Sequence, residues 1–256
     1  MSKKLYLTIL AFIELAAILF GCIYHLGGLG LKLPAIHLGS LFEKSSVTES
    51  AQTALDSFDE IELDASVMNL TIVPGETWSY ATDCSEKLAP TVKVSGNKLI
   101  VEQKKNVKLF PSLKQNQLRC DMKLTVPKDV TFSEVSLDID MGDMKLNGIQ
   151  AKELTLSESM GNITLTDSSA KTVRISNDLG NVTIRDCAID DLDAELDMGN
   201  AEASLTNGDY GYDLSTDLGN IKVNGEKQKS TYRSKGSSDR TIKIHDDMGN
   251  IEIETR

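Results

Sequence analysis

A short motif that recurs six times most strongly constrains how this chain can fold. It follows the pattern Asp-x-Gly-Asn-x-x-aliphatic, with substitutions in some copies, and occupies residues 140–146, 159–165, 178–184, 197–203, 217–223 and 247–253. The glycines are 19, 19, 19, 20 and 30 residues apart, at Gly142, Gly161, Gly180, Gly199, Gly219 and Gly249. Such regular recurrence is typical of repeat architectures, in which each unit buries its apolar face only against its neighbours.

Apolar and polar residues alternate within each unit, which indicates strands rather than helices. At the repeat spacing, one apolar file contains Val135, Leu154, Val173, Leu192 and Tyr212, and another contains Met144, Ile163, Val182, Ala201, Ile221 and Ile251. We therefore predict an all-β fold, a β-solenoid or parallel β-helix-like stack of 19-residue coils about 4.8 Å apart. A β-sandwich or meander, in which each glycine turn is a hairpin, is the alternative.

The polar residues of the motif are expected to form the turns between strands. Glycine adopts positive φ at little cost, and an Asx side chain bonds nearby backbone groups. The structural repeat turns then comprise the six glycines together with Asn162, Asn181, Asn200, Asn220 and Asn250. The last interval exceeds 19 residues by 11, and its Lys-, Ser- and Gly-rich segment 224–240 is predicted to project as a basic loop.

The chain before the motifs divides into an apolar segment, a stalk and a weaker β-pattern. Residues 5–26 are apolar apart from Glu14, long enough for a transmembrane helix, and are preceded by Lys3 and Lys4. The positive-inside rule puts residues 1–4 in the cytoplasm and the rest outside, as a single-pass protein of the cell membrane. Residues 27–54 are predicted to be a stalk, residues 55–130 an N-terminal β-cap, and residues 131–256 the regular repeats.

Two other interpretations of the N-terminus stay open. The sequence around Cys22 resembles a lipoprotein signal, and an ordinary cleaved signal is the other alternative. A carboxylate such as Glu14 is costly in mid-membrane, so it is either protonated or a contact with a membrane partner.

Composition narrows the class of partner. The formal net charge of −11 argues against a nucleic-acid backbone, because phosphate contacts need clustered Lys and Arg. Aromatic residues make up only 5% of the chain, so the core is expected to be thin and aliphatic. Three histidines leave little material for histidine-based catalysis, and the sequence has no zinc spacing, phosphate loop or nucleophile motif, so we predict no cofactor.

Carboxylates suggest two further hypotheses. Five motif aspartates should stack along one edge, where they either form weak Ca²⁺ sites or cap the turns, namely Asp140, Asp178, Asp197, Asp217 and Asp247. The acidic group Asp190, Asp191 and Asp193 is either a solvated face or part of a carbohydrate-cleaving site.

The cysteines outside the apolar segment give two further expectations. Cys187 should be buried, whereas pairing of Cys84 with Cys120 stays open.

The apolar N-terminal segment followed by Gly27-Gly28, the Val126-Pro127 step and the repeated motif resemble the bacterial putative-adhesin family, a domain of unknown function with β-strand repeats. The resemblance covers residues 55–256 and implies a membrane-anchored protein of the Gram-positive cell envelope. We therefore expect a non-enzymatic binding or adhesion role toward an envelope protein or cell-wall polymer. The alternatives are a membrane partner in envelope-stress signalling and a carbohydrate-active β-helix enzyme.

Overall fold

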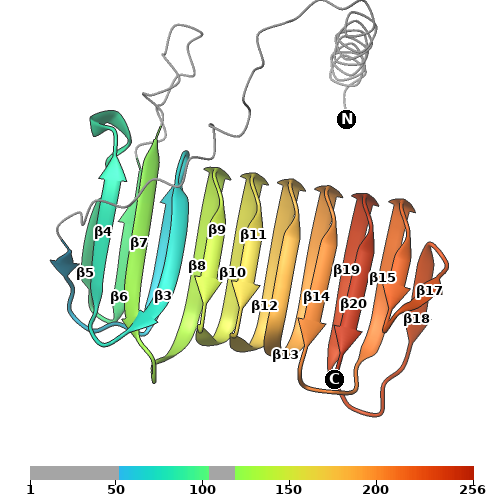
Figure 1. Ribbon diagram of the computed structural model, residues 1–256. Coiled ribbons are helices and arrows are strands. Elements are labelled where there is room, and N and C mark those ends of the chain that lie inside the picture. The colour runs from blue at the N-terminus through green and yellow to red at the C-terminus, as the bar shows by residue number, and fades with distance from the viewer. Residues whose placement is uncertain (1–51, 104–118) are drawn as a thin grey trace, which may run out of the picture. The chain divides into compact units, whose positions relative to one another are not determined.

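The computed structural model describes residues 52–103 and 119–256, which form two sheets that enclose an aliphatic core (Figure 1). In spatial order the first sheet contains β5 (Thr91–Ser95), β6 (Lys98–Glu102), β2 (Glu60–Ala65), β8 (Thr131–Met141), β10 (Gln150–Met160), β12 (Ser169–Leu179), β13 (Val182–Met198), β19 (Thr241–Met248), β15 (Gly211–Leu218) and β18 (Thr231–Ser234).

The second sheet contains β1 (Thr53–Ala54), β4 (Ser79–Cys84), β7 (Cys120–Pro127), β3 (Asn69–Gly75), β9 (Met144–Asn147), β11 (Ile163–Thr166), β13, β14 (Ala201–Leu205), β20 (Ile251–Thr255), β16 (Ile221–Val223) and β17 (Glu226–Gln228). Strand β13 belongs to both sheets, because it continues through the corner between them. One 3₁₀ turn, η2 (Glu86–Leu88), follows β4.

Neighbouring coils pair in parallel at the offset that the motif predicts. Leu154 lies between Val135 and Val173 in the first sheet, and Ile163 lies between Met144 and Val182 in the second. These side chains are buried, which confirms the predicted apolar files and the solenoid-like fold. A meander of hairpins is excluded for these coils, because hairpin strands pair antiparallel.

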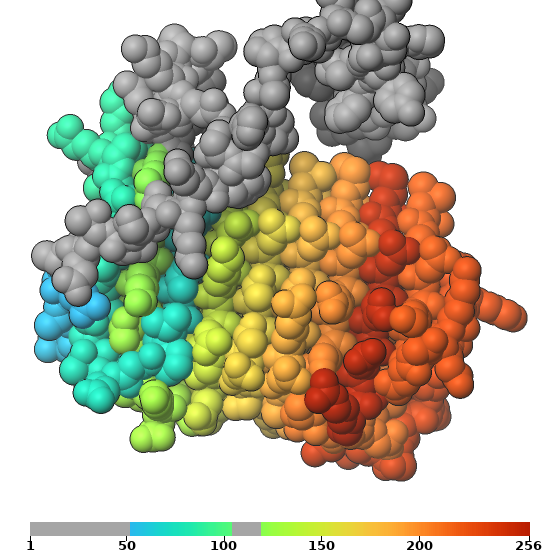
Figure 2. All heavy atoms as spheres, viewed as in Figure 1, coloured from blue at the N-terminus to red at the C-terminus, as the bar shows by residue number. Residues whose placement is uncertain are grey.

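The order of the coils in space differs from their order in the chain. Strand β19 lies between β13 and β15, and β20 lies between β14 and β16. The last motif copy is therefore inserted between the two copies that precede it, as the red strands among orange ones show in Figure 1 and as a red stripe in Figure 2.

The prediction that segment 224–240 projects as a loop is wrong for most of the segment, whose longest irregular stretch is residues 235–240. Residues 226–234 contain β17 and β18, which pair antiparallel with β16 and β15 at the end of the stack. An uncovered parallel strand would present a row of unpaired N–H and C=O groups to other chains. The extra residues supply short antiparallel strands that cover this edge.

The N-terminal end is built in the same way. Strand β2 lies between β6 and β8, and β3 lies between β7 and β9. The coil formed by β2 and β3 is therefore first in the chain but second in the stack, inside the coil formed by β6 and β7. Strands β5 and β4 then cover the edge by antiparallel pairing with β6 and β7. Cys84 and Cys120 face each other across β4 and β7 and form a disulfide, which settles the open question of their pairing.

Aromatic side chains within the described ranges gather at the two ends of the stack. Trp78 contacts Phe58 and Phe132 at the N-terminal end, with ring centroids 4.3 and 6.2 Å away. Tyr212 and Tyr232 pair at the C-terminal end, with centroids 5.8 Å apart. The coils between them have the aliphatic core that the composition predicts, and Cys187 is buried there as expected.

No helix in the described ranges is long and apolar enough to cross a membrane. The predicted span at residues 5–26, including Glu14 and Cys22, lies outside these ranges.

Candidate functional site

The six motif copies come together along one corner of the solenoid, which we call the motif edge. Each motif asparagine donates its side-chain N–H and its backbone N–H to the Asx oxygen of the neighbouring coil. For example, Asn181 bonds Asn162 Oδ1 with its Nδ2 at 3.2 Å and its backbone N at 3.1 Å. The ladder contains Asp143, Asn162, Asn181, Asn200, Asn250 and Asn220 in spatial order, so the Asx side chains link coils rather than only capping their own turns.

The motif glycines are needed mainly because the coils approach closely. A Cβ atom on Gly161, Gly180, Gly199, Gly219 or Gly249 would lie only 1.4 to 1.7 Å from the carbonyl oxygen of a neighbouring glycine. Positive φ, the reason expected from the sequence, applies to Gly142, Gly180 and Gly199, at 143°, 149° and 159°. Because the close approach recurs even where φ lies outside that range, steric contact between coils is the shared cause.

Beneath these glycines an inward-facing file contains several polar side chains. In spatial order it contains Ile139, Glu158, Asn177, Leu196, Asp246 and Thr216. Asn177 Nδ2 donates to the Gly161 carbonyl oxygen at 3.1 Å, and Thr216 Oγ1 donates to that of Gly249 at 3.1 Å. Asn177 and Thr216 therefore bond the backbone of the neighbouring turn.

Glu158 and Asp246 are the carboxyl groups of this file. Both are buried, and their oxygens form no hydrogen bond of normal geometry within the described part of the chain. Burial raises the pKa of Glu158 to about 8, with Asp143, Asp138 and Asp140 contributing and the Met160 amide opposing. Burial likewise raises the pKa of Asp246 to about 6. Glu158 is accordingly mostly protonated at neutral pH.

Outside the same corner runs a row of exposed apolar side chains, one from each motif copy. In spatial order this apolar row contains Met141, Met160, Leu179, Met198, Met248 and Leu218. Five of the six are 37 to 68% exposed, which is unusual for large apolar residues that recur at one position. Strict alternation predicts that the residue directly before each motif glycine points inward, because the residue two places before it is buried. The chain bends at the glycine, and this residue faces outward instead.

The predicted row of aspartates flanks the apolar row on the side of the first sheet. Asp140, Asp178, Asp197, Asp217 and Asp247 are each exposed and directly precede a member of the apolar row. The pKa of Asp197 is raised by partial burial and by the charges of Asp178 and Asp247. In the described ranges no three His, Cys, Asp or Glu side chains are grouped so that they could hold a metal ion, and the Ca²⁺ hypothesis stays a prediction.

The acidic group Asp190, Asp191 and Asp193 contacts the inserted coil. Asp190 Oδ1 lies 3.0 Å from Arg240 Nε, Asp191 Oδ1 accepts a bond from Thr241 at 2.8 Å, and Asp193 Oδ1 lies 3.1 Å from Lys243 Nζ. These contacts join β13 to the inserted strand β19 and its preceding turn, so the carboxylates have a structural role there.

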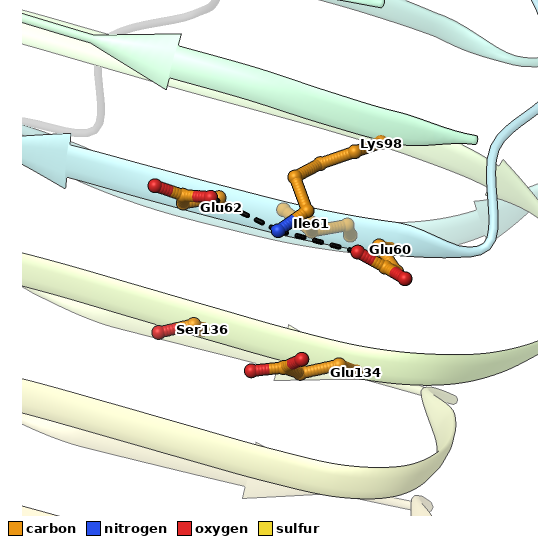
Figure 3. A pocket seen from close by; sticks show the side chains of 6 residues that line it. All are labelled: Glu60, Ile61, Glu62, Lys98, Glu134 and Ser136. Atoms are coloured by element: carbon orange, nitrogen blue, oxygen red, sulfur yellow. Dashed lines mark hydrogen bonds and ion pairs between the residues drawn. The ribbon is translucent and has the colours of Figure 1, made fainter. Parts of the chain in front are cut away.

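A shallow depression of about 140 Å³ lies on the outer face of the first sheet (Figure 3). Lys98 Nζ lies 3.2 Å from Glu60 Oε2 and 3.1 Å from Glu62 Oε2, and Glu134 and Ser136 extend from the next strand. The carboxylates raise the pKa of Lys98 through hydrogen bonds. These half-exposed ion pairs on an open face provide little enclosure for a ligand.

Two solved structures are similar to the chain. A putative cell adhesion protein from Clostridium sporogenes matches at a TM-score of 0.53 with 16% identity, over 80% of this chain and 98% of that one. A putative adhesin from Bacteroides fragilis matches at a TM-score of 0.44 with 13% identity, over 79% of this chain and 94% of that one.

No curated protein matches the sequence. The family model described as Toastrack DUF4097 matches residues 58–254, which includes the whole motif edge. This match confirms the resemblance noted from the motifs, a putative-adhesin family of unknown function. The chain therefore belongs to the Toastrack DUF4097 family.

Proposed function

We propose that this chain is a non-enzymatic binding protein of the bacterial cell envelope, anchored in the membrane by residues 5–26 with its solenoid outside the cell. The observation that carries the binding role is the apolar row, which exposes a large apolar side chain on five of six neighbouring coils. Exposed apolar surface of this extent marks interaction sites, and solenoids use extended surfaces of this kind for binding.

A protein partner fits this surface better than a cell-wall polymer. Methionine and leucine side chains offer dispersion contacts and apolar burial, which stabilise protein interfaces. A polymer rich in hydroxyl groups would instead need polar groups to bond it across the whole surface, whereas the row is apolar and the asparagines on one side of it already bond one another.

Location is tested by fusing alkaline phosphatase after Arg256, because this enzyme is active only where its disulfides form. We expect activity from the full chain and none from a variant that lacks residues 5–26. Activity in both, or in neither despite expression, would contradict the proposed location.

Binding is tested by a photo-crosslinking amino acid placed singly at Leu179 on the motif edge, Arg174 on the first sheet and Thr183 on the second. We expect a protein adduct in intact cells from at least one of these faces. If no face yields an adduct, the binding role is wrong.

A further inference from the structure

The apolar row has the dimensions of a binding site for one helix. Its six residues come from six adjacent coils, and five intervals of about 4.8 Å give a length of about 24 Å. A helix of about 16 residues has that length, and its pitch of about 5.4 Å per turn is close to the coil spacing. Met160, Met198 and Met248 have flexible side chains that adapt to a partner's surface.

The surroundings of the row are strongly acidic on one side. The motif aspartates lie beside it, with Asp138 and Glu195 exposed two positions earlier on the same strands. The basic residues beside them on the first sheet are His245, whose Nε2 lies 3.1 Å from Asp247 Oδ1, and Lys243, which pairs with Asp193 and lies near Glu195. On the other side of the row lies the ladder, whose members are neutral asparagines except for Asp143 at one end.

We propose that the motif edge binds a cationic amphipathic helix of a partner protein. The apolar face of the helix packs on the methionine and leucine row, and its Lys or Arg residues contact the aspartates. The proposal rests on the proposed binding function and specifies the partner for it.

Other occupants fit less well. An extended peptide would need free backbone groups, but those at the corner are used between coils: Gly161 N donates to the Leu179 carbonyl at 2.9 Å, and Ile163 N to that of Asn181 at 3.0 Å. A second copy of this edge or an anionic bilayer would place negative charge against the aspartates.

The test uses the full chain in phosphatidylcholine nanodiscs and a fluorescent 18-residue helical peptide made of Leu and Lys in an amphipathic pattern. Binding is followed by fluorescence anisotropy, with empty nanodiscs subtracted. The matched peptide replaces every Lys with Glu. We expect the Lys peptide to bind at least ten-fold more tightly than the Glu peptide, and its affinity to fall with added salt.

Variants locate the site. The triple change Met160→Gln, Leu179→Gln and Met198→Gln should weaken binding of the Lys peptide at least ten-fold. The pair Asp178→Asn and Asp197→Asn should weaken it several-fold and reduce its salt dependence. The control, Thr164→Gln with Thr183→Gln on the second sheet, should bind like the wild type. Circular dichroism confirms that each variant is folded.

Equal binding of the two peptides, or unchanged binding by the triple variant, would overturn the proposal. A bimane label at Leu179→Cys, in a chain that also carries Cys22→Ala so that no label enters the proposed membrane segment, tests the bilayer alternative. Quenching of this label by doxyl lipid in the nanodisc, without peptide, would assign the row to lipid and also overturn the proposal. If the peptide fails while crosslinking still gives a protein adduct at Arg174 or Thr183, the binding function stands and only this partner is wrong.

Discussion

Replacing Glu158 with Gln should stabilise the solenoid by an amount that grows with pH. The carboxyl group is only 1% exposed, and its pKa of about 8 lies above the ordinary 4.5. Between these two values the unfolded chain loses a proton that the folded chain keeps, so wild-type stability falls as pH rises. Each pKa unit corresponds to about 1.4 kcal/mol, which gives a ceiling of about 5 kcal/mol above pH 8.

Glutamine carries no charge and supplies an N–H donor, as Asn177 does in the next coil when it bonds the Gly161 carbonyl. We therefore expect Glu158→Gln to match the wild type within about 1 kcal/mol near pH 4.5 and to exceed it by about 3–5 kcal/mol at pH 9. The single tryptophan, Trp78, packs at the N-terminal end and reports unfolding there by fluorescence. Circular dichroism reports on the whole stack.

The assay is urea denaturation of the full chain in zwitterionic detergent at several pH values from 4.5 to 9. The matched control is Glu195→Gln, which makes the same change on an exposed residue of β13. If wild type and Glu158→Gln keep a constant stability difference across this range, or if Glu195→Gln reproduces the trend, burial of Glu158 does not control the pH dependence.

Three other changes test the contacts between coils. Gly180→Ala places a Cβ atom 1.7 Å from a backbone oxygen and should prevent folding or cost more than about 4 kcal/mol, whereas Gly225→Ala, which meets nothing within 4 Å, should cost about 1 kcal/mol; circular dichroism during thermal melting compares them. Asn181→Ala removes ladder bonds on both sides and should cost about 2–3 kcal/mol by urea denaturation, and a loss below about 0.5 kcal/mol would show that the ladder does not join the coils. The double change Cys84→Ser and Cys120→Ser opens a crosslink that spans 36 positions and should cost about 3–4 kcal/mol, and equal melting temperatures with and without a reductant would contradict this.

The sequence was sufficient to predict the stack because the motif and the apolar files repeat at one spacing. It did not reveal the order of the coils. Leu192 pairs with Ile242 of the last coil, but Tyr212 of the preceding coil is an apolar residue at the same position and would fit beside Leu192 equally well. The two coils differ in the charges of their outward-facing residues, because Arg240 and Lys243 of the inserted coil form ion pairs with Asp190 and Asp193. The alternation of apolar and polar residues identifies the inward positions but does not predict such ion pairs between strands.

The apolar row was missed for a related reason. Its residues are visible in the sequence as the Met or Leu before each motif glycine, but a two-residue period assigns them to the core. Only the geometry of the bend shows that they face solvent.

The first and last coils of the chain each lie one position inside the ends of the stack, and this placement limits how the protein can vary in length. Antiparallel strands close each end, so a duplicated unit added at either terminus would have no open strand to pair with. A 19-residue unit added between Gly161 and Gly180 would meet the same neighbours as existing coils and leave both closures intact. Relatives of different size should therefore differ in the number of central coils, and the motif edge should lengthen or shorten in steps of one coil.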